Sequence, residues 1–196
     1  MRGARLLAGV VVVLSAAAGA QASTPVVPTP IGSGALYHPA PRGSLLGTAS
    51  ARDTLSCSRA RERRVGAHLE LFARGLVVLV PAGIGVAPPL HAAGGTKVAG
   101  SCSFPARTRE PTGVVEVVPH SGMALGDFFT LWGQPLGSRR LAGFHAVRGE
   151  RVRAWVNGRA WRGDPRTVPL LRHTEIVLEL GRFIPPHESY RFEKGL

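Results

Sequence analysis

Residues Thr112 to Leu136, with the sequence TGVVEVVPHSGMALGDFFTLWGQPL, predict a strand followed by a short turn and an amphipathic helix. The β-branched run 114–118 favours an extended strand, and Pro119 ends it. Gly133 suits the position just after a helix C-terminus. The spacing i, i+3, i+4 and i+7 places four large apolar residues on one helical face: Leu125, Phe128, Phe129 and Trp132. Such a face must be buried, so we expect a sheet beneath it.

The segments on either side of this unit predict the strands of that sheet. Residues 68–73 alternate in polarity, and Arg74-Gly75 is a turn into the apolar run 76–80. Asn157-Gly158 lies between alternating segments, and Asn-Gly is the preferred two-residue hairpin turn because both positions need positive φ. Residues 174–180 predict the last strand, with its apolar residues facing the core and its glutamates facing solvent. We therefore predict an α+β domain, with a mainly antiparallel sheet of about six strands and one amphipathic helix packed on one face.

The N-terminus has the three parts of a secretory signal peptide. Residues 1–22 combine a charged start, an apolar stretch and a small-residue cleavage site after Ala22. The apolar stretch of about 13 residues is too short to span a bilayer comfortably, although an uncleaved N-terminal membrane anchor is the alternative. No later window is apolar for long enough to be a membrane helix. We therefore predict export, followed by a flexible Pro/Gly/Ser-rich linker over 23–50 and a single globular domain over 51–196.

Two cysteines, Cys57 and Cys102, are present. In an exported chain an even pair of cysteines is more often bridged than free. Closing a loop of about 46 residues would stabilise the fold by roughly 4 kcal/mol in the chain-entropy model. The sequence therefore predicts one disulfide.

The formal net charge of +12 is carried mainly by arginine. Such a charge favours anionic partners in general. The arginines are scattered, however, and lack the interleaved aromatic residues of a single-strand binding surface. This pattern favours a solvated basic face and disfavours nucleic acid as a partner. An anionic cell-envelope polymer is the partner that the charge leaves open.

Catalytic motifs are missing from the sequence. There is no G-x-S-x-G, H-E-x-x-H or C-x-x-C, so an enzyme is disfavoured. None of the seven histidines is paired at a typical metal-ligand spacing. His68 begins one predicted strand and His173 precedes another, so the two side chains could meet at one end of the sheet. A metal site would combine these two with His120 or His145.

A series of motifs runs in order from Cys57 to the C-terminus. They are AHLELF at 67–72, VPAGIGV at 80–86, Cys102 followed by TGVV at 112–115, LGDFFTLWGQPL at 125–136, VNGRAWRGDPR at 156–166 and PLLRHTEIVLELG at 169–181. In these motifs the chain resembles an uncharacterised family of exported proteins from high-GC bacteria. The resemblance covers most of the domain and implies no established activity.

The resemblance also implies a set of histidines that this chain has largely replaced. Members of the family carry a His-x-His run before the first strand, a His-Thr-His after the second cysteine and a further histidine before the helix. Such a set implies ligation of zinc or copper by imidazole. The corresponding residues in this sequence are Arg64, Gly66, Arg107, Arg109 and Glu116. Arginine has no free lone pair and cannot ligate a metal, so the resemblance implies a degenerate site or, alternatively, an anion pocket.

These observations lead to one principal hypothesis and two alternatives. The principal hypothesis is an exported, non-enzymatic binding or structural domain without a cofactor. The first alternative is an extracytoplasmic zinc- or copper-binding protein that uses His68, His173 and His120. The second is a binder of anionic polymers that uses Arg64, Arg107 and Arg109.

Overall fold

The computed structural model describes residues 34–40, 55–95 and 97–196. The predicted signal peptide, 1–22, lies outside the described residues, as does most of the predicted linker. One part of that linker belongs to the fold, because β1 (Leu36–Tyr37) pairs in parallel with β3 (Leu76–Val78). The ring of Tyr37 also packs edge-on against Phe144, with 4.6 Å between the ring centroids.

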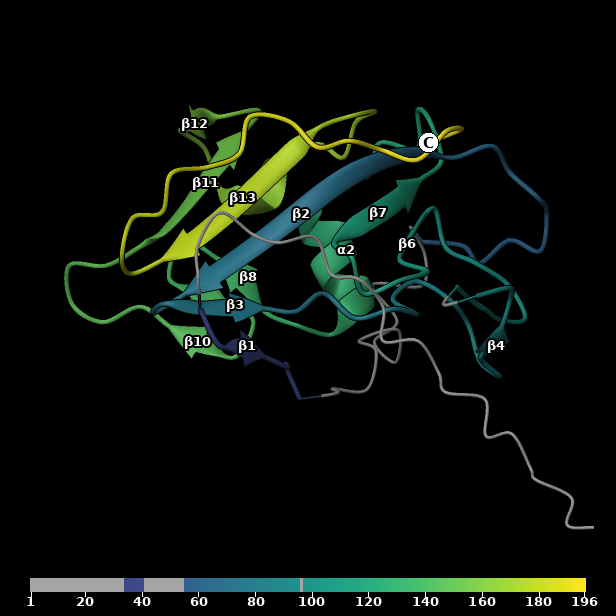
Figure 1. Cartoon of the computed structure of the whole chain (residues 1–196), viewed down its shortest axis with the longest axis horizontal. Coiled ribbons are helices and arrows are strands. Elements are labelled where there is room, and N and C mark those ends of the chain that lie inside the picture. Colours follow the sequence, from purple (N-terminus) through teal and green to yellow (C-terminus); the bar gives the residue numbers. More distant parts are fainter. Residues whose placement is uncertain (1–33, 41–54, 96) are drawn as a thin grey trace, which may run out of the picture.

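The main sheet is organised around β2 (Val65–Ala73), its longest strand among the described residues. On one side β2 pairs in parallel with β13 (Glu175–Leu180). On the other side its first half pairs with β7 (Val114–Val117) and its last residues with β3, both antiparallel. The hairpin of β11 (Val152–Val156) and β12 (Arg159–Trp161) continues the sheet beyond β13. β6 (Ala106–Arg107) pairs with β7, which brings the sheet to eight strands (Figure 1).

Shorter elements complete the domain. β8 (Leu136–Gly137), β9 (Arg140–Leu141) and β10 (Phe144–His145) form a three-stranded sheet. β4 (His91–Ala92) and β5 (Val98–Ala99) form a two-stranded one. A 3-10 turn at Pro165–Thr167 follows β12. The predicted fold class, α+β with a mainly antiparallel sheet and one helix, is confirmed.

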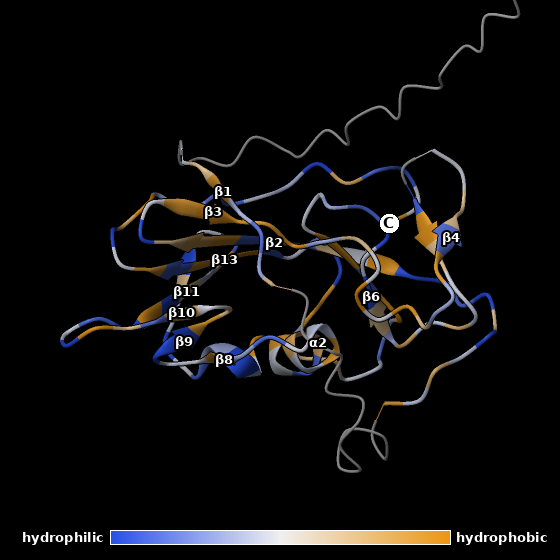
Figure 2. Ribbon diagram, turned by 90° about the horizontal axis from the view of Figure 1, so that it is seen from below, coloured by the Kyte–Doolittle hydropathy of each residue, from blue (hydrophilic) through white to orange (hydrophobic). Residues whose placement is uncertain are grey.

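The predicted amphipathic helix is α2 (Leu125–Trp132), which covers one face of the main sheet (Figure 2). The Asp127 carboxylate accepts a hydrogen bond from Ala124 N at 2.9 Å, which satisfies a donor that the first turn leaves free. Gly133 ends the helix at φ 71°, a left-handed conformation that glycine adopts without strain. The rings of Phe128 and Phe129 are fully buried and join the core with the apolar residues of β2 and β13.

The disulfide between Cys57 and Cys102 is present, with a sulfur–sulfur distance of 1.98 Å. It ties the segment before β2 to the segment before β6. Among the described residues, the structure contains no helix with the length and apolarity that crossing a bilayer requires.

The predicted exposure of the glutamates in the last strand is wrong. Glu175 and Glu179 were expected to face solvent, yet both are fully buried. The alternation itself is right, since Ile176, Leu178 and Leu180 join the helix-side core. The error arises because the C-terminal segment, residues 182–196, runs back along the sheet and covers its second face (Figure 1).

Replacement of Phe129 by alanine should lower the free energy of unfolding by about 3–5 kcal/mol, because it leaves a cavity under α2. Denaturant-induced unfolding of the purified domain measures this difference. Leu171→Ala is the control, since Leu171 is 58% exposed, and it should change stability by less than about 0.5 kcal/mol. An equal effect of the two substitutions would contradict the assignment of Phe129 to the core.

Candidate functional site

Polar residues of β2 and β13 lie on the face of the sheet opposite α2. The parallel register places His68 beside Glu175, and Glu70 one step further along β2. Neighbouring residues of a strand point to opposite faces, so His68 and Glu70 face away from the apolar residues that pack on the helix. Two strands of one sheet therefore present an imidazole and two carboxylates side by side.

The C-terminal segment closes over this polar face. Its Ile184 packs against a small apolar cluster that includes Phe72 and Val177. Its Tyr190 ring stacks on the His68 ring, with 3.8 Å between the centroids. As a result His68 is 2% exposed, and Glu70 and Glu175 are also buried.

The imidazole of His68 has a defined role for each nitrogen. Nε2 lies 3.0 Å from the main-chain oxygen of Thr112, which can only accept a hydrogen bond, so Nε2 is the donor. Nδ1 lies 2.8 and 3.0 Å from the two carboxylate oxygens of Glu175. In a neutral ring this Nδ1 carries a lone pair. Two electron-rich groups in contact need either a shared proton or a cation between them.

Burial is the main influence on the protonation of Glu175. Removal from water raises the pKa of this carboxyl group, while its contact with His68 acts in the opposite direction. The charge of the neighbouring Glu70 raises the pKa further. Ionisation of both carboxyl groups is therefore unfavourable unless a positive charge lies beside them.

One group of possible metal ligands is found among the described residues. It consists of His68, Glu70 and Glu175, whose ligand atoms all lie within 4.8 Å of one another. Imidazole nitrogen with carboxylate oxygen is a donor set that Zn²⁺ and other divalent transition metals accept. The three side chains are all buried, and they come from two paired strands, which hold them on a rigid base.

The other histidines of the predicted metal site lie elsewhere. His173 is exposed, and its Nε2 contacts the main-chain oxygen of Leu196 at 2.7 Å while its ring stacks on Phe192. His120 and His145 are exposed. Of the predicted set, only His68 belongs to the buried group. The sequence contained a signal for the partners that we missed, since His68 and Glu70 share one side of an alternating strand.

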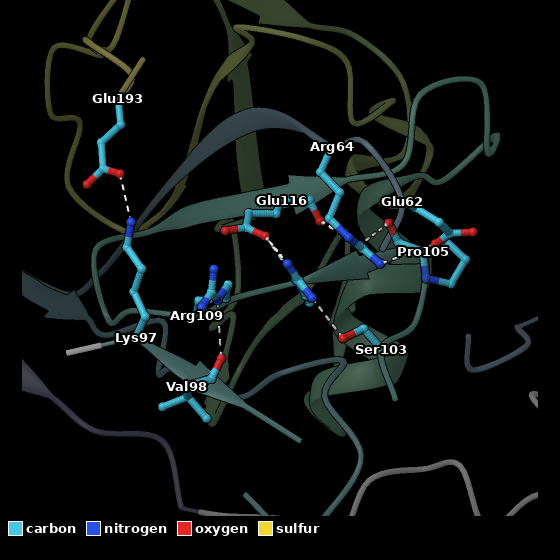
Figure 3. Close-up of polar contacts among 10 residues, drawn as sticks. Glu62, Arg64, Lys97, Val98, Ser103, Pro105, Arg109, Glu116 and Glu193 are labelled. Carbon is cyan, nitrogen blue, oxygen red and sulfur yellow. Dashed lines mark hydrogen bonds and ion pairs between the residues drawn. The ribbon is translucent and has the colours of Figure 1, made fainter. Parts of the chain in front are cut away.

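Three of the replaced histidine positions, Arg64, Gly66 and Arg107, lie beside a fourth, Glu116, and Figure 3 shows the surroundings of Glu116. The register pairs Glu116 of β7 with both Gly66 of β2 and Arg107 of β6. Arg107 donates from Nε and Nη2 to Oε2 of Glu116, at 2.8 and 2.7 Å, and from Nη1 to Ser103 Oγ at 2.9 Å. The chain thus places a partly buried ion pair where the resemblance implies histidines.

The two remaining arginines of the predicted anion pocket also donate to protein oxygens. Arg64 is 7% exposed and donates from Nη1 to the main-chain oxygen of Pro105 at 3.0 Å. Burial lowers the pKa of its guanidinium, and the charge of Arg107 lowers it further. Arg109 donates from Nε to Val98 O at 3.3 Å (Figure 3). These contacts give each arginine a partner inside the protein, which does not favour an anion pocket.

Comparisons with protein-family models, curated proteins and solved structures found no match. The resemblance to a family of exported proteins therefore stays a prediction.

Replacement of Arg107 by alanine should lower the free energy of unfolding by about 1–3 kcal/mol, because Glu116 would stay largely buried without its partner. The double substitution Arg107→Ala and Glu116→Gln should recover part of that loss, since it removes the charge as well. Denaturant-induced unfolding of the two single variants, Arg107→Ala and Glu116→Gln, and of the double variant gives the coupling free energy between the two side chains. If the effects of the two single substitutions add up to that of the double substitution, the pair makes no specific contribution.

Proposed function

We propose that this protein is an exported, non-enzymatic domain that binds a divalent transition-metal ion, Zn²⁺ being the first candidate, through His68, Glu70 and Glu175. The proposal keeps the principal hypothesis of a binding domain and names its ligand. It also changes the residues, since Glu70 and Glu175 take the place of the predicted His173 and His120.

The contact between His68 and Glu175 carries the proposal. A histidine that ligates a metal usually donates its second ring N–H to a main-chain carbonyl or a carboxylate, which fixes the ring and its tautomer. His68 makes such a hydrogen bond from Nε2 to Thr112 O, and it directs Nδ1 toward the carboxylate of Glu175. Nδ1 and the carboxylate oxygens thus lie close enough together to share one ion, which supports the proposal.

Charge supports the same conclusion. Glu175 faces the imidazole of His68 and Glu70 faces that of His187, and burying two carboxylates there is unfavourable for folding unless a positive charge compensates them. A divalent cation would supply that charge and share the carboxylate oxygens. The alternative is a structural network compensated by a proton on His68 or Glu175, and the experiments below separate the two.

The proposed location outside the cytoplasm is supported by the signal-like sequence of residues 1–22 and by the disulfide of Cys57 with Cys102. A metal-binding protein outside the cytoplasm acts without the cytosolic thiols that compete for zinc. The basic surface is compatible with retention near anionic envelope polymers.

Isothermal titration of tag-free protein with ZnCl₂ should show about one ion bound per chain. Glu175→Gln should weaken binding at least about tenfold, because it removes an anionic ligand. His120→Ala is the matched control, since His120 is exposed, and it should bind like the wild type. Occupancy below about 0.1 ion per chain after incubation with excess metal would refute the proposal.

Without metal, Glu175→Gln should be as stable as the wild type or more stable. The amide can donate to His68 Nδ1, and the buried negative charge is gone. At a ZnCl₂ concentration of about 100 times the dissociation constant, the wild type should gain about 2.7 kcal/mol and the variant much less. Thermal unfolding with and without ZnCl₂ measures both quantities. A metal-free variant that is less stable by more than about 3 kcal/mol would favour the structural network instead.

A further inference from the structure

The C-terminal segment places one more potential ligand at the cluster. His187 Nδ1 lies 3.0 and 3.1 Å from the two carboxylate oxygens of Glu70. It approaches Glu70 from the covering segment, whereas His68 and Glu175 approach from the strands. The same chemical argument applies here, because a lone pair that faces a carboxylate needs a proton or a cation between them.

We propose that His187 is the fourth ligand of the metal site and that the C-terminal segment is a clasp that closes over the ion. This inference rests on the proposed function. Two imidazoles and two carboxylates form the four-coordinate nitrogen and oxygen set that suits Zn²⁺. His187 does not belong to the group whose ligand atoms lie within 4.8 Å of one another, so ligation draws the segment toward the strands.

The attachment of the segment suits such a closing movement. Within the described part of the chain, no backbone–backbone hydrogen bond joins residues 182–196 to a strand. The segment is held mainly through side chains: Tyr190 on His68, Phe192 on His173, and Lys97 to Glu193 at 2.9 Å. Segments held in this way open without unfolding the sheet beneath them, because the backbone ladders stay intact.

Two glycines shape the path of the segment. Gly181, at φ 100°, turns the chain back just after β13 and is the natural hinge. Gly66 of β2 leaves the space that the Phe192 ring fills, since a Cβ at Gly66 would lie 2.6 Å from Phe192 Cδ1. The closed position of the segment is therefore defined at both of its ends.

The open segment exposes the buried group and gives an ion a path to it. Once the ion is bound, His187 joins the segment to the strands through the metal. Binding and closure are then linked, because anything that stabilises the closed form also raises the affinity for the ion.

Hydrogen–deuterium exchange of the full-length protein, with and without ZnCl₂, tests the clasp. In the wild type, ZnCl₂ should slow exchange of the amides of residues 182–196 at least about tenfold, because opening must break a metal bond. In His187→Ala this protection should be lost and Zn²⁺ should bind at least about tenfold more weakly. Amides of β13 report whether the sheet stays folded.

His173→Ala is the matched control variant. It removes contacts of the same segment, to Phe192 and Leu196, without removing a proposed ligand. The segment should then exchange faster in the absence of metal, but ZnCl₂ should still slow that exchange. Loss of the zinc effect in His173→Ala as well would overturn the specific role of His187.

The outcomes separate this inference from the proposed function. If His187→Ala binds Zn²⁺ like the wild type, or if ZnCl₂ leaves exchange of the segment unchanged, the clasp is wrong while metal binding through the strands stands. If the wild type binds no Zn²⁺, both are wrong.

Discussion

The structure depends on the parallel pairing of β2 with β13, two strands that are buried on both faces. All nine residues of β2 and all six of β13 are buried. A parallel pair needs a covering layer on each side, because both faces would otherwise expose apolar residues to water. Here α2 covers one face and the C-terminal segment covers the other (Figure 1). The two layers have different chemistry, and that difference creates the candidate site.

On the helix side the contacts are apolar, as the packing of Phe128 and Phe129 with Leu71 and Ile176 in one core shows. On the other side the same two strands bury His68, Glu70 and Glu175. A face made for stability alone would carry apolar residues, because burying carboxylates is unfavourable unless they are compensated. This face therefore combines a small apolar cluster with a buried group of possible metal ligands.

The carboxylate of Glu116 is also largely removed from water, but an arginine of the same chain compensates its charge. Arg107 donates two hydrogen bonds to the Glu116 carboxylate, so the protein itself compensates the charge, and Arg64 donates to the main-chain oxygen of Glu116. Around Glu175 the available partner is an imidazole, which carries a positive charge only when it is protonated. The charge of Glu116 is thus compensated by a permanently charged side chain, whereas the compensation of Glu175 depends on the protonation of the cluster.

Local patterns in the sequence were sufficient for the helix, the strands of three or more residues, the Asn157-Gly158 hairpin and the disulfide pair. Each depends on residues near one another along the chain or, for Cys57 and Cys102, on the even number of cysteines in a chain predicted to be exported. The predicted set of His68 with His173 and His120 depended on guessing which segments meet, and only His68 lies in the buried group. Tertiary structure alone decided that β13 lies beside β2 in the register of His68 with Glu175. It also decided that residues 182–196 return over both strands, because such contacts join residues more than 100 positions apart and leave no periodic signal.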